Sequence, residues 1–586
     1  MNNDEKLEKM EGEQERILSF PSWFMEKIKG AVKRRTWEAG GDFNAKLRGD
    51  DHTERLEHLR KLFGNFLTFL YPNKYLAFYA RLAKLLDEIT SLSEGRIDLS
   101  SNSVLDFHRD PEVVVAMVKS LLKKGTSGDR SGDFRNAQGQ AYEDPLDIYL
   151  STLEVEEVML FNNGTIANAA VLQGILSLFR NLEEAPCIIM DPRDHTSLQK
   201  PIRDSKLPDN KIITPSLADH NNIDKLKELI SKHENGVLIL ESVYSAEGDI
   251  LGDGDKQAVK ELLELANQKS FIVIIDESHA IGVHNPDLMS EWGLNHLVHF
   301  KTASGSKGTG GGASFLTING EGSDHVARIF KLIEPFTFTS TLHGSAIAHD
   351  RKVFEIMQDE RGERGSQCIA NAEYLRNRLK SRDFDIESKE GSAIVFIPVG
   401  FSEAAFEFTE ILKKRGVIGS AFVAHATPLD KGGVRLSIPA KLTQTQLDFI
   451  FEAIMESVQE FMKTLLAKEG NTLESLRSNQ HVVRFNDEAF QDPKAKVRQE
   501  PLHYVDPNFI LIYERWHNKE GEESITGYQD YLRKCLGNIL DIDPKNGARI
   551  HQALSAGLSK GLPGELVGAV TINAVHRIFG NQVPII

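Results

Sequence analysis

The sequence has little cysteine and no long apolar run, and each shortage excludes a class of protein. Only three cysteines occur in 586 residues, Cys187, Cys368 and Cys535, and no pair has CxxC spacing. This excludes a disulfide framework or a cysteine zinc site, fits core cysteines in a reducing compartment, and leads us to expect no bound metal. No segment has the unbroken apolar length of a bilayer span. The polar, acidic start MNNDEKLEKMEGEQ is unlike a signal peptide, so we expect a cytoplasmic protein.

An excess of positive charge is also missing. The chain has 85 acidic and 69 basic residues and a formal net charge of −16, which argues against nucleic acid as the main partner. A local exception is residues 20–37, FPSWFMEKIKGAVKRRTW, where aromatic and aliphatic residues mix with lysine and arginine. We expect an amphipathic helix packed on its own protein, and an interfacial helix in contact with a membrane is the alternative.

The sequence pattern changes along the chain and predicts four regions. Residues 1–95 have helical periodicity and few strand signals, which predicts a helical N-terminal extension. Residues 96–345 alternate short continuous apolar runs with amphipathic stretches, which is typical of an α/β domain with a mostly parallel sheet. Residues 346–465 predict a smaller α+β domain. Residues 466–586 form a C-terminal extension with helical material near its end, and its role cannot be inferred from the sequence.

The first candidate site follows the run VMLF. The stretch NNGTIAN comes next and begins a predicted helix, so that Gly164, Thr165 and Ile166 offer backbone N–H groups and a hydroxyl at a helix N-terminus. Such a terminus is a ready phosphate site, and simple helix capping is the alternative.

Further reactive residues follow the next predicted strands. His195 comes after CIIMD, Ser245 after GVLILE, and Asp276 and His279 after FIVII. A lone aspartate or histidine at a strand end usually has a structural role. Ligands of open α/β sheets, however, gather at the carboxyl ends of the strands, and here successive strand ends all have chemistry to offer.

Lys307 lies in the segment FKTASGSKGTGGGASFLT, among glycine and serine. A flexible surface loop is the bland interpretation. A phosphate site, a ring-stacking group, a carboxylate and an amine are together what pyridoxal phosphate requires, because the amine forms a Schiff base and the carboxylate keeps the pyridine nitrogen protonated. Small neighbours would let the amine swing away and let the backbone pass close to the phosphate.

Several motifs resemble those of the pyridoxal-phosphate-dependent α-oxoamine synthases, a branch of the fold-type I aminotransferase superfamily. The resembling stretches are FNNGTIAN, DHTSL, ESVYSAEGD, DESHAIG, TASGSKGTGGGA, FTST and GGVRLSIPA. Among them SVYSAEGD, DESHAIGVH and TASGSK are most similar to the α-hydroxyketone autoinducer synthases. The resemblance runs from Phe161 to about Ala440, and it implies the fold-type I transferase fold and a homodimer.

The resemblance also implies roles for single residues. Lys307 would be the Schiff-base lysine, Asp276 the partner of the pyridine nitrogen, and His195 the group stacked on the ring. Ser245 and His279 would lie near the ring hydroxyl. The phosphate would be bound by Gly164, Thr165, Ile166 and Ser304, with Ser340 or Thr341 from the second chain. The substrate would be bound by Arg435 with Asn102. A planar arginine suits a substrate carboxylate.

The implied reaction is a C-acyl transfer. An amino acid, or an amino substrate similar to S-adenosylmethionine, would lose its α-proton to Lys307, attack an acyl-CoA or acyl-carrier-protein thioester, and give an aminoketone after decarboxylation. An aminotransferase or decarboxylase on the same fold is the alternative, and an idle homologue acting as an interaction module is another. Residues 123–145 contain a shorter form of the glycine-rich stretch found in the family, so the identity of the substrate is not determined by the resemblance.

Overall fold

The computed structural model describes residues 20–27, 96–125, 146–468, 471–478 and 505–516, except for short gaps at 338, 340–341, 387, 389, 401, 424–426 and 428–430. These residues form two compact units. The first contains the described residues within 1–71, 116–245 and 249–366, and the second contains those within 72–115, 246–248 and 367–586.

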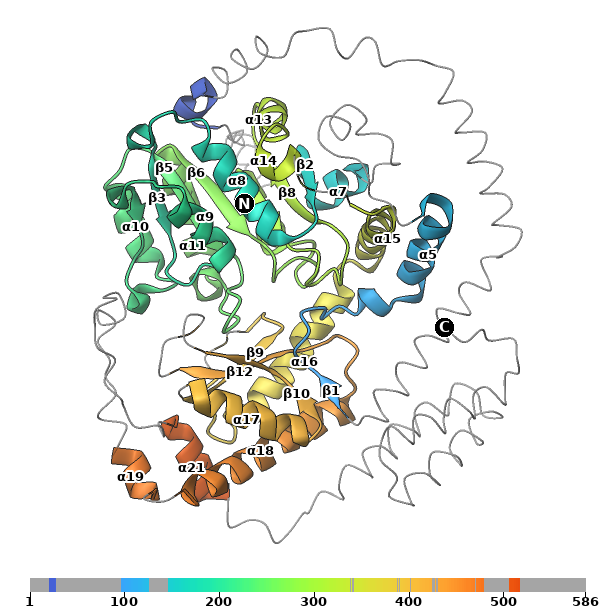
Figure 1. Ribbon diagram of the computed structural model, residues 1–586, viewed down its shortest axis with the longest axis vertical. Helices are drawn as coiled ribbons and strands as arrows, with labels where there is room; N and C mark the ends of the chain where they lie inside the picture. Colours follow the sequence, from blue (N-terminus) through green and yellow to red (C-terminus); the bar gives the residue numbers. More distant parts are fainter. Residues whose placement is uncertain are drawn as a thin grey trace, which may run out of the picture. The chain divides into compact units, whose positions relative to one another are not determined.

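The first unit is built on a seven-stranded sheet with the order β2-β8-β7-β6-β5-β3-β4 (Figure 1). All strands run parallel except β8, which is antiparallel to both of its neighbours. The strands are β2 (Glu157–Phe161), β3 (Cys187–Met190), β4 (Ile212–Ile213), β5 (Gly236–Glu241), β6 (Phe271–Asp276), β7 (Phe300–Ala303) and β8 (Ser314–Ile318). Every residue of β3, β5, β6, β7 and β8 is buried, which explains the continuous apolar runs of β3, β5 and β6.

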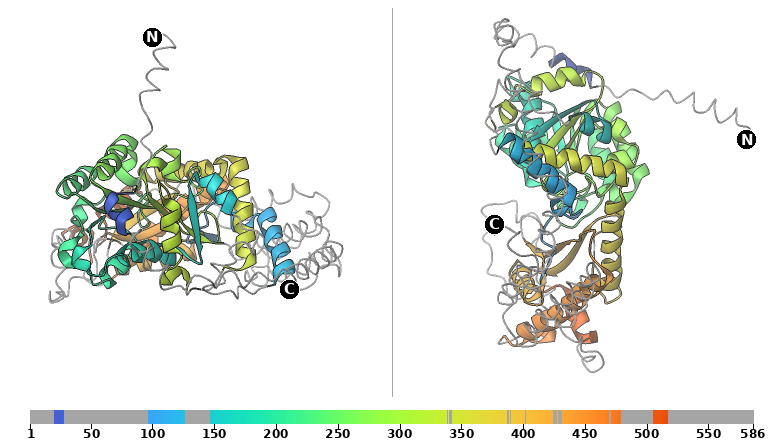
Figure 2. Two further views of the ribbon diagram at one scale, coloured as in Figure 1. Left: turned by 90° about the horizontal axis from the view of Figure 1, so that it is seen from above. Right: turned by 90° about the vertical axis from the view of Figure 1, so that its right-hand side faces the viewer.

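Helices cover both faces of this sheet (Figure 2). Side chains of α8, α9 and α13 pack with one set of alternate strand residues, and side chains of α10, α11 and α12 pack with the other set. The helices of this unit are α7 (Leu146–Leu153), α8 (Gly164–Leu176), α9 (Thr196–Asp204), α10 (Ile223–Ser231), α11 (Lys256–Gln268), α12 (Leu288–Glu291), α13 (Ser323–Phe330), α14 (Glu334–Thr337) and α15 (Gly344–Glu360).

The described part of the N-terminal extension, residues 20–27, packs on the first unit. Phe20 and Phe24 are 4% and 0% exposed, and their rings contact each other and Phe300, the first residue of β7. Trp23 Nε1 donates to the carbonyl of Ser270, just before β6, at 3.1 Å. This aromatic anchor, residues 20–27, therefore buries Phe20 and Phe24 against its own protein, as expected for this part of the predicted helix. Residues 28–37 lie outside the described residues.

The second unit contains a three-stranded antiparallel sheet, β11-β12-β9, and a separate parallel pair of β1 with β10. Its strands are β1 (Ile97–Asp98), β9 (Ile394–Gly400), β10 (Val417–Ile418), β11 (Ser420–Phe422) and β12 (Gly432–Ser437). Its helices are α17 (Ser402–Lys414), α18 (Gln444–Leu466), α19 (Leu473–Ser478) and α21 (Pro507–Trp516). Two further helices, α5 (Pro111–Lys124) and α16 (Glu363–Lys380), each contribute residues to both units. Thr443 and Gln446 form a capping box that starts α18.

Part of the C-terminal extension packs on this second unit. Val505 forms an antiparallel bridge with Gly400, and the ring of Phe509 in α21 contacts Phe384, Phe408 and Phe461. These described residues therefore complete the apolar core of the unit.

The structure confirms the mostly parallel sheet, the α+β second unit and helical segments in both extensions. The reversed direction of β8 and the short strands β1, β4, β10 and β11 were not predicted, since two or three residues give no periodic signal. Cys187 and Cys368 are buried, as expected of core residues. Among the helices that the structure describes, none combines the length and apolar character needed to cross a bilayer.

Candidate active site

The loop that carries Lys307 joins β7 to β8 and is closed on itself. Gly311 N donates to the carbonyl of Gly305 at 2.7 Å, and a Cβ at Gly305 would lie 2.0 Å from the carbonyl oxygen of Ala313. Gly310, Gly311 and Gly312 all have positive φ, a region that other residues rarely adopt. The glycines therefore serve a compact turn in which the backbone is packed against itself, rather than an open surface loop.

The end of this loop is fixed by Asp350 of α15. The Asp350 carboxylate is 1% exposed and accepts hydrogen bonds from the Ala313 N–H, at 2.6 Å, and from the Tyr149 hydroxyl. A Cβ at Gly312 would lie 1.6 Å from Asp350 Oδ1, so the backbone passes directly over the carboxylate at a position that only glycine can occupy.

The structure brings Lys307 and His279 together. Lys307 Nζ lies 2.8 Å from His279 Nε2. His279 belongs to the turn after β6, and β6 and β7 are parallel neighbours, so the topology places both residues at the carboxyl edge of the sheet.

Asp276, the last residue of β6, lies at the same edge and is 4% exposed. Its Oδ1 accepts the Ser278 N–H at 2.8 Å, and its Oδ2 accepts Asn168 Nδ2 of α8 at 2.8 Å. Both of these partners, the Ser278 amide and the Asn168 side chain, are uncharged donors. A carboxylate held this way keeps acceptor capacity for a further N–H group, as a protonated ring nitrogen requires.

His195 is the N-cap residue of α9. Its Nδ1 lies 2.7 Å from Ser197 Oγ and accepts the Ser197 backbone N–H at 3.2 Å. The backbone N–H of His195 donates to Glu241 Oε1, and Glu241 is the cross-strand neighbour of Asp276. His195 and Asp276 are thus linked to the same edge of the sheet through Glu241.

Several carboxyl groups are buried behind His195. Burial and, next, the charge of Asp276 raise the pKa of Glu241 well above its usual range. Burial, with the charges of Asp191 and Glu241, does the same to the pKa of Asp194. Burying carboxylates is unfavourable, so their accumulation at one sheet edge indicates a functional region.

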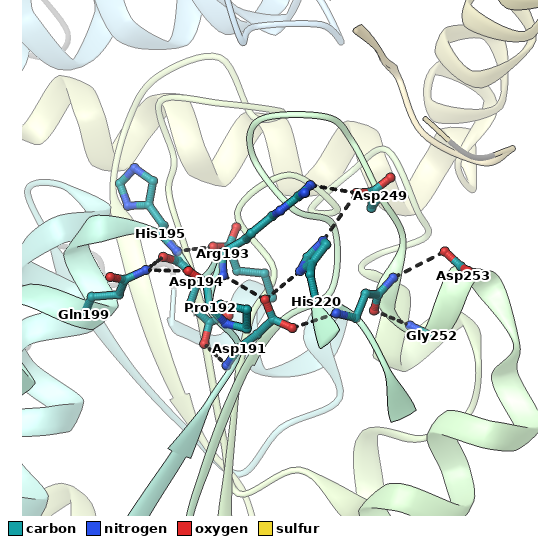
Figure 3. A network of polar contacts seen from close by, with 12 residues as sticks. Asp191, Pro192, Arg193, Asp194, His195, Gln199, His220, Asp249, Gly252 and Asp253 are labelled. Carbon is teal, nitrogen blue, oxygen red and sulfur yellow. Dashed lines mark hydrogen bonds and ion pairs between the residues drawn. The ribbon is translucent and has the colours of Figure 1, made fainter. Parts of the chain in front are cut away.

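Figure 3 shows a polar network beside this group, with the ring of His195 pointing away from it. His220 Nδ1 lies 2.6 Å from Asp191 Oδ1, and its Nε2 lies 3.3 Å from Asp249 Oδ2. Burial alone would lower the pKa of His220, but the hydrogen bonds with both aspartates outweigh it and raise the pKa. Arg193 Nη1 adds an ion pair with Asp249 Oδ2 at 3.9 Å. The network holds the turn before His195.

The predicted phosphate residues lie at the start of α8. Asn163 caps the helix by accepting the Ile166 N–H at 2.9 Å, which gives one of the three predicted amides a partner within the protein. A Cβ at Gly164 would lie 2.9 Å from Ser304 Cβ, so the helix N-terminus and the Lys307 loop approach closely. Thr165 is exposed, and Ser304 Oγ lies 3.0 Å from Ser306 Oγ. Amides and hydroxyls therefore converge here, as an oxyanion requires.

The remaining predicted residues lie elsewhere. Ser245 is half-buried in the turn after β5, and its role stays a prediction. Ser340 and Thr341 lie outside the described residues.

Arg435 and Asn102 belong to the second unit, where Arg435 Nη2 donates to Asn102 Oδ1 at 3.0 Å and the guanidinium lies 4.3 Å from the ring centroid of Phe422. Burial lowers the pKa of Arg435 to about 10, so the side chain is still a cation at neutral pH. It retains the charge that binding a carboxylate requires.

The sequence analysis missed Asn168, Ser197, Glu241 and Asp350. A signal existed for Asn168, since a polar residue follows one turn after the start of an otherwise apolar helix. No local signal distinguished Glu241 from an ordinary strand end or Asp350 from a helix surface residue, because both owe their contacts to distant parts of the chain.

The donors and acceptors of the first unit fit pyridoxal phosphate. Lys307 offers an amine, Asp276 offers a carboxylate with neutral partners, and the start of α8 with Ser304 offers donors that converge where a side chain at Gly164 would not fit.

Comparisons with known proteins agree with this fit. The family model described as aminotransferase class I and II matches residues 94–454. A CAI-1 autoinducer synthase of Vibrio campbellii is 26% identical over 370 residues, covering 62% of this chain and 87% of that protein. An 8-amino-7-oxononanoate synthase of Thermoanaerobacter pseudethanolicus is 27% identical over 385 residues, covering 62% and 88%.

Among solved structures, a serine palmitoyltransferase from S. paucimobilis with a bound PLP–myriocin aldimine has a TM-score of 0.55 and 20% identity, over 63% of this chain and 88% of that chain. The likeness in fold confirms the predicted fold-type I architecture.

Proposed function

Because the chain belongs to the aminotransferase class I and II family, we propose that it is a pyridoxal-phosphate-dependent C-acyltransferase that condenses an amino acid, or a similar amino substrate, with an acyl thioester to give an aminoketone. The observation that carries the proposal is the placement of Lys307, with Nζ 2.8 Å from His279 Nε2, beside Asp276 on the neighbouring strand. The names of the autoinducer synthase and the oxononanoate synthase support the acyl-transfer class.

Pyridoxal phosphate, when bound, supplies an aldehyde for an amine and a ring that accepts electrons from a neighbouring C–H bond. Lys307 would hold the aldehyde carbon and, with its amine free, could take the α-proton of the substrate. Asp276 would keep a proton on the ring nitrogen, and the His195 imidazole would lie against the ring. The amides of Gly164 and Thr165, with the Ser304 hydroxyl, would bind the phosphate.

Arg435 binds the substrate carboxylate in this proposal, and its burial supports the role because a partly desolvated guanidinium binds an anion more strongly than an exposed one. The acyl donor is a thioester of coenzyme A or of a carrier protein. The amino substrate is an α-amino acid or a compound such as S-adenosylmethionine, which has the same α-amino carboxylate.

The first test is chemical trapping. The purified protein should absorb visible light, and borohydride should fix the cofactor on Lys307, which peptide mass spectrometry would identify. Lys301 serves as the internal control, because it is 2% exposed and paired with Asp287 at 2.6 Å. A label on any lysine other than Lys307 would contradict the assignment.

The second test separates acyl transfer from amino-group transfer, since the same lysine and aspartate serve both. Absorption spectra recorded with a panel of amino acids and S-adenosylmethionine, with and without acyl-CoA, should change further only when both substrates are present. Amino-group transfer to a 2-oxo acid without a thioester would favour the aminotransferase alternative. No spectral response to any substrate would favour the idle homologue.

We also propose a homodimer in which Ser340 or Thr341 of one chain binds the phosphate held by the other. The hydroxyl-rich run FTFTSTLH supports this assignment. A Lys307→Ala chain mixed with a chain altered at both Ser340 and Thr341 should regain activity, because one site of each mixed dimer has all its groups. A fully active monomer would exclude the shared site.

A further inference from the structure

A continuous chain of hydrogen bonds joins Asp276 to His195. Asn168 Nδ2 lies 2.8 Å from Asp276 Oδ2 and 2.8 Å from Ser197 Oγ. Ser197 Oγ in turn lies 2.7 Å from His195 Nδ1. Asn168 and Ser197 are 2% and 6% exposed, so these contacts form away from bulk water. The two groups proposed to act on the cofactor ring are therefore connected through side chains with no role in the reaction described above.

The direction of these hydrogen bonds, from donor to acceptor, follows from the carboxylate of Asp276. A carboxylate oxygen only accepts hydrogen bonds, so the Asn168 atom that faces it must be the amide nitrogen. The same nitrogen faces Ser197 Oγ, which therefore accepts. The Ser197 hydroxyl accepts from Asn168 and still has its own proton to donate, and His195 Nδ1 lies 2.7 Å from its oxygen.

The opposite end gives the same answer independently. The backbone N–H of Ser197 also points at His195 Nδ1, at 3.2 Å, and a backbone N–H can only donate. His195 Nδ1 must therefore be an acceptor, and the imidazole proton must lie on Nε2. A proton on Nδ1 would face the Ser197 backbone N–H, donor against donor.

We infer that Asn168 and Ser197 are positioning residues. Asn168 donates to Asp276 and to Ser197, Ser197 donates to His195 Nδ1, and these bonds hold the imidazole in the neutral form with the proton on Nε2. The amide oxygen of Asn168 is consistent with this role, because within the described residues it is buried without a hydrogen-bond partner. The site of Asn168 is thus determined by its two donor protons.

The inference gives His195 a defined function. A neutral ring stacks on the cofactor without adding a positive charge that would compete with the proton on the ring nitrogen, and its Nε2–H remains a donor. The inference rests on the proposed roles of Asp276 and His195, but the imidazole tautomer can be measured without any substrate.

The direct test is nuclear magnetic resonance of the full-length protein labelled with ¹⁵N in histidine only, with the His195 signals assigned from a His195→Gln variant. We expect an unprotonated Nδ1 and a protonated Nε2 in the wild type. Ser197→Ala removes the shorter of the two contacts to Nδ1 and leaves only the backbone N–H at 3.2 Å, so both signals should shift part of the way towards a mixture of forms. Ser197→Thr, which keeps the hydroxyl, should restore them. A protonated Nδ1 in the wild type, or unchanged signals in Ser197→Ala, would overturn the inference.

Kinetics supply the second readout. Ser197→Ala and Asn168→Ala should each lower kcat about ten-fold, the size of effect expected for one lost hydrogen bond, while KM for the amino substrate changes little. The matched control is Asn371→Ala in the second unit. Asn371 is also buried and donates to two backbone carbonyls, at 2.9 and 3.1 Å.

We expect Asn371→Ala to lower the melting temperature without changing the His195 signals. If Asn168→Ala does not fold, Ser197→Ala alone decides, since it leaves the bond between Asn168 and Asp276 in place. A borohydride label away from Lys307 would count against the proposed function, whereas unchanged His195 signals would count only against this relay.

Discussion

The two ends of the seven-stranded sheet bury opposite kinds of side chain. At the carboxyl end lie Glu241, Asp276 and Glu277, all at most 4% exposed. At the amino end, the aromatic anchor packs Phe24 and its neighbours against Phe300 and against the turn before β6. The same strands therefore end where carboxyl groups are buried, which is unfavourable, and begin where aromatic rings are buried, which is favourable.

This difference places groups that serve stability and groups that serve function at opposite ends of the same sheet. Burying carboxyl groups is unfavourable even where Lys301 or Lys307 partly offsets it, so their accumulation at the carboxyl end is explained by the chemistry proposed there. Buried aromatic rings stabilise the amino end by packing. Substitutions at the two ends should consequently have opposite signatures, one in turnover and the other in unfolding.

The largest effect is expected from Asp276→Asn. Without a carboxylate the ring nitrogen loses its proton, and kcat/KM should fall by about 100- to 10,000-fold, the range typical of a positioned proton-transfer group. The melting temperature should stay the same or rise, since a buried charge is removed. Steady-state kinetics and thermal unfolding would check both. Near-normal turnover would mean that the carboxyl end does not work as proposed.

At the amino end, Phe24→Ala should destabilise the first unit by about 3–5 kcal/mol, as is usual when a buried phenylalanine is truncated. Activity at temperatures where the variant remains folded should be unchanged. Phe406→Ala is the matched control, because Phe406 is 54% exposed and should alter the free energy of unfolding by no more than about 0.5 kcal/mol. A small decrease in the free energy of unfolding of Phe24→Ala would indicate that the anchor detaches before the sheet unfolds.

The third expected effect is a pH dependence that only the carboxyl end confers. Burial, aided by Asp287 and opposed by Lys301, raises the pKa of Glu277 from 4.5 to about 8. Between these values the unfolded state has released a proton that the folded state still holds, so this group makes the protein less stable as pH rises.

Denaturant unfolding of the wild type and Glu277→Gln at pH 5, 7 and 8.5 measures this contribution. The stability of the wild type relative to the variant should fall as pH rises, because glutamine cannot ionise. A difference that does not vary with pH would show that Glu277 ionises alike in both states. Phe24→Ala should leave the pH dependence as it is in the wild type.

The sequence predicted the strands of the first unit where burial on both faces left unbroken runs, as in GVLILE and FIVIID. It also predicted that Lys307, His279, Asp276 and His195 lie at strand ends or just after them. These features depend on local pattern and on the rule that parallel strands share an edge.

What the sequence could not predict depends on distant contacts. Asn168 gains its role from Asp276, which is 108 positions away, and Asp350 contacts Ala313 from 37 positions away. The reversal of β8 follows from the tight loop after Lys307, and no periodicity encodes strand direction. The predicted roles of Ser340 and Thr341 fall outside the described residues and remain predictions.

The aromatic anchor also has a consequence for how the first unit folds. Trp23 of the anchor contacts Ser270 across 247 positions of the sequence, and Phe24 contacts Phe300, which lies farther still along the chain. In kinetic terms these are non-local contacts, which form late because the entropy lost on closing a long segment is offset only once the contact is made. The amino ends of the strands should therefore be covered after the sheet itself has formed.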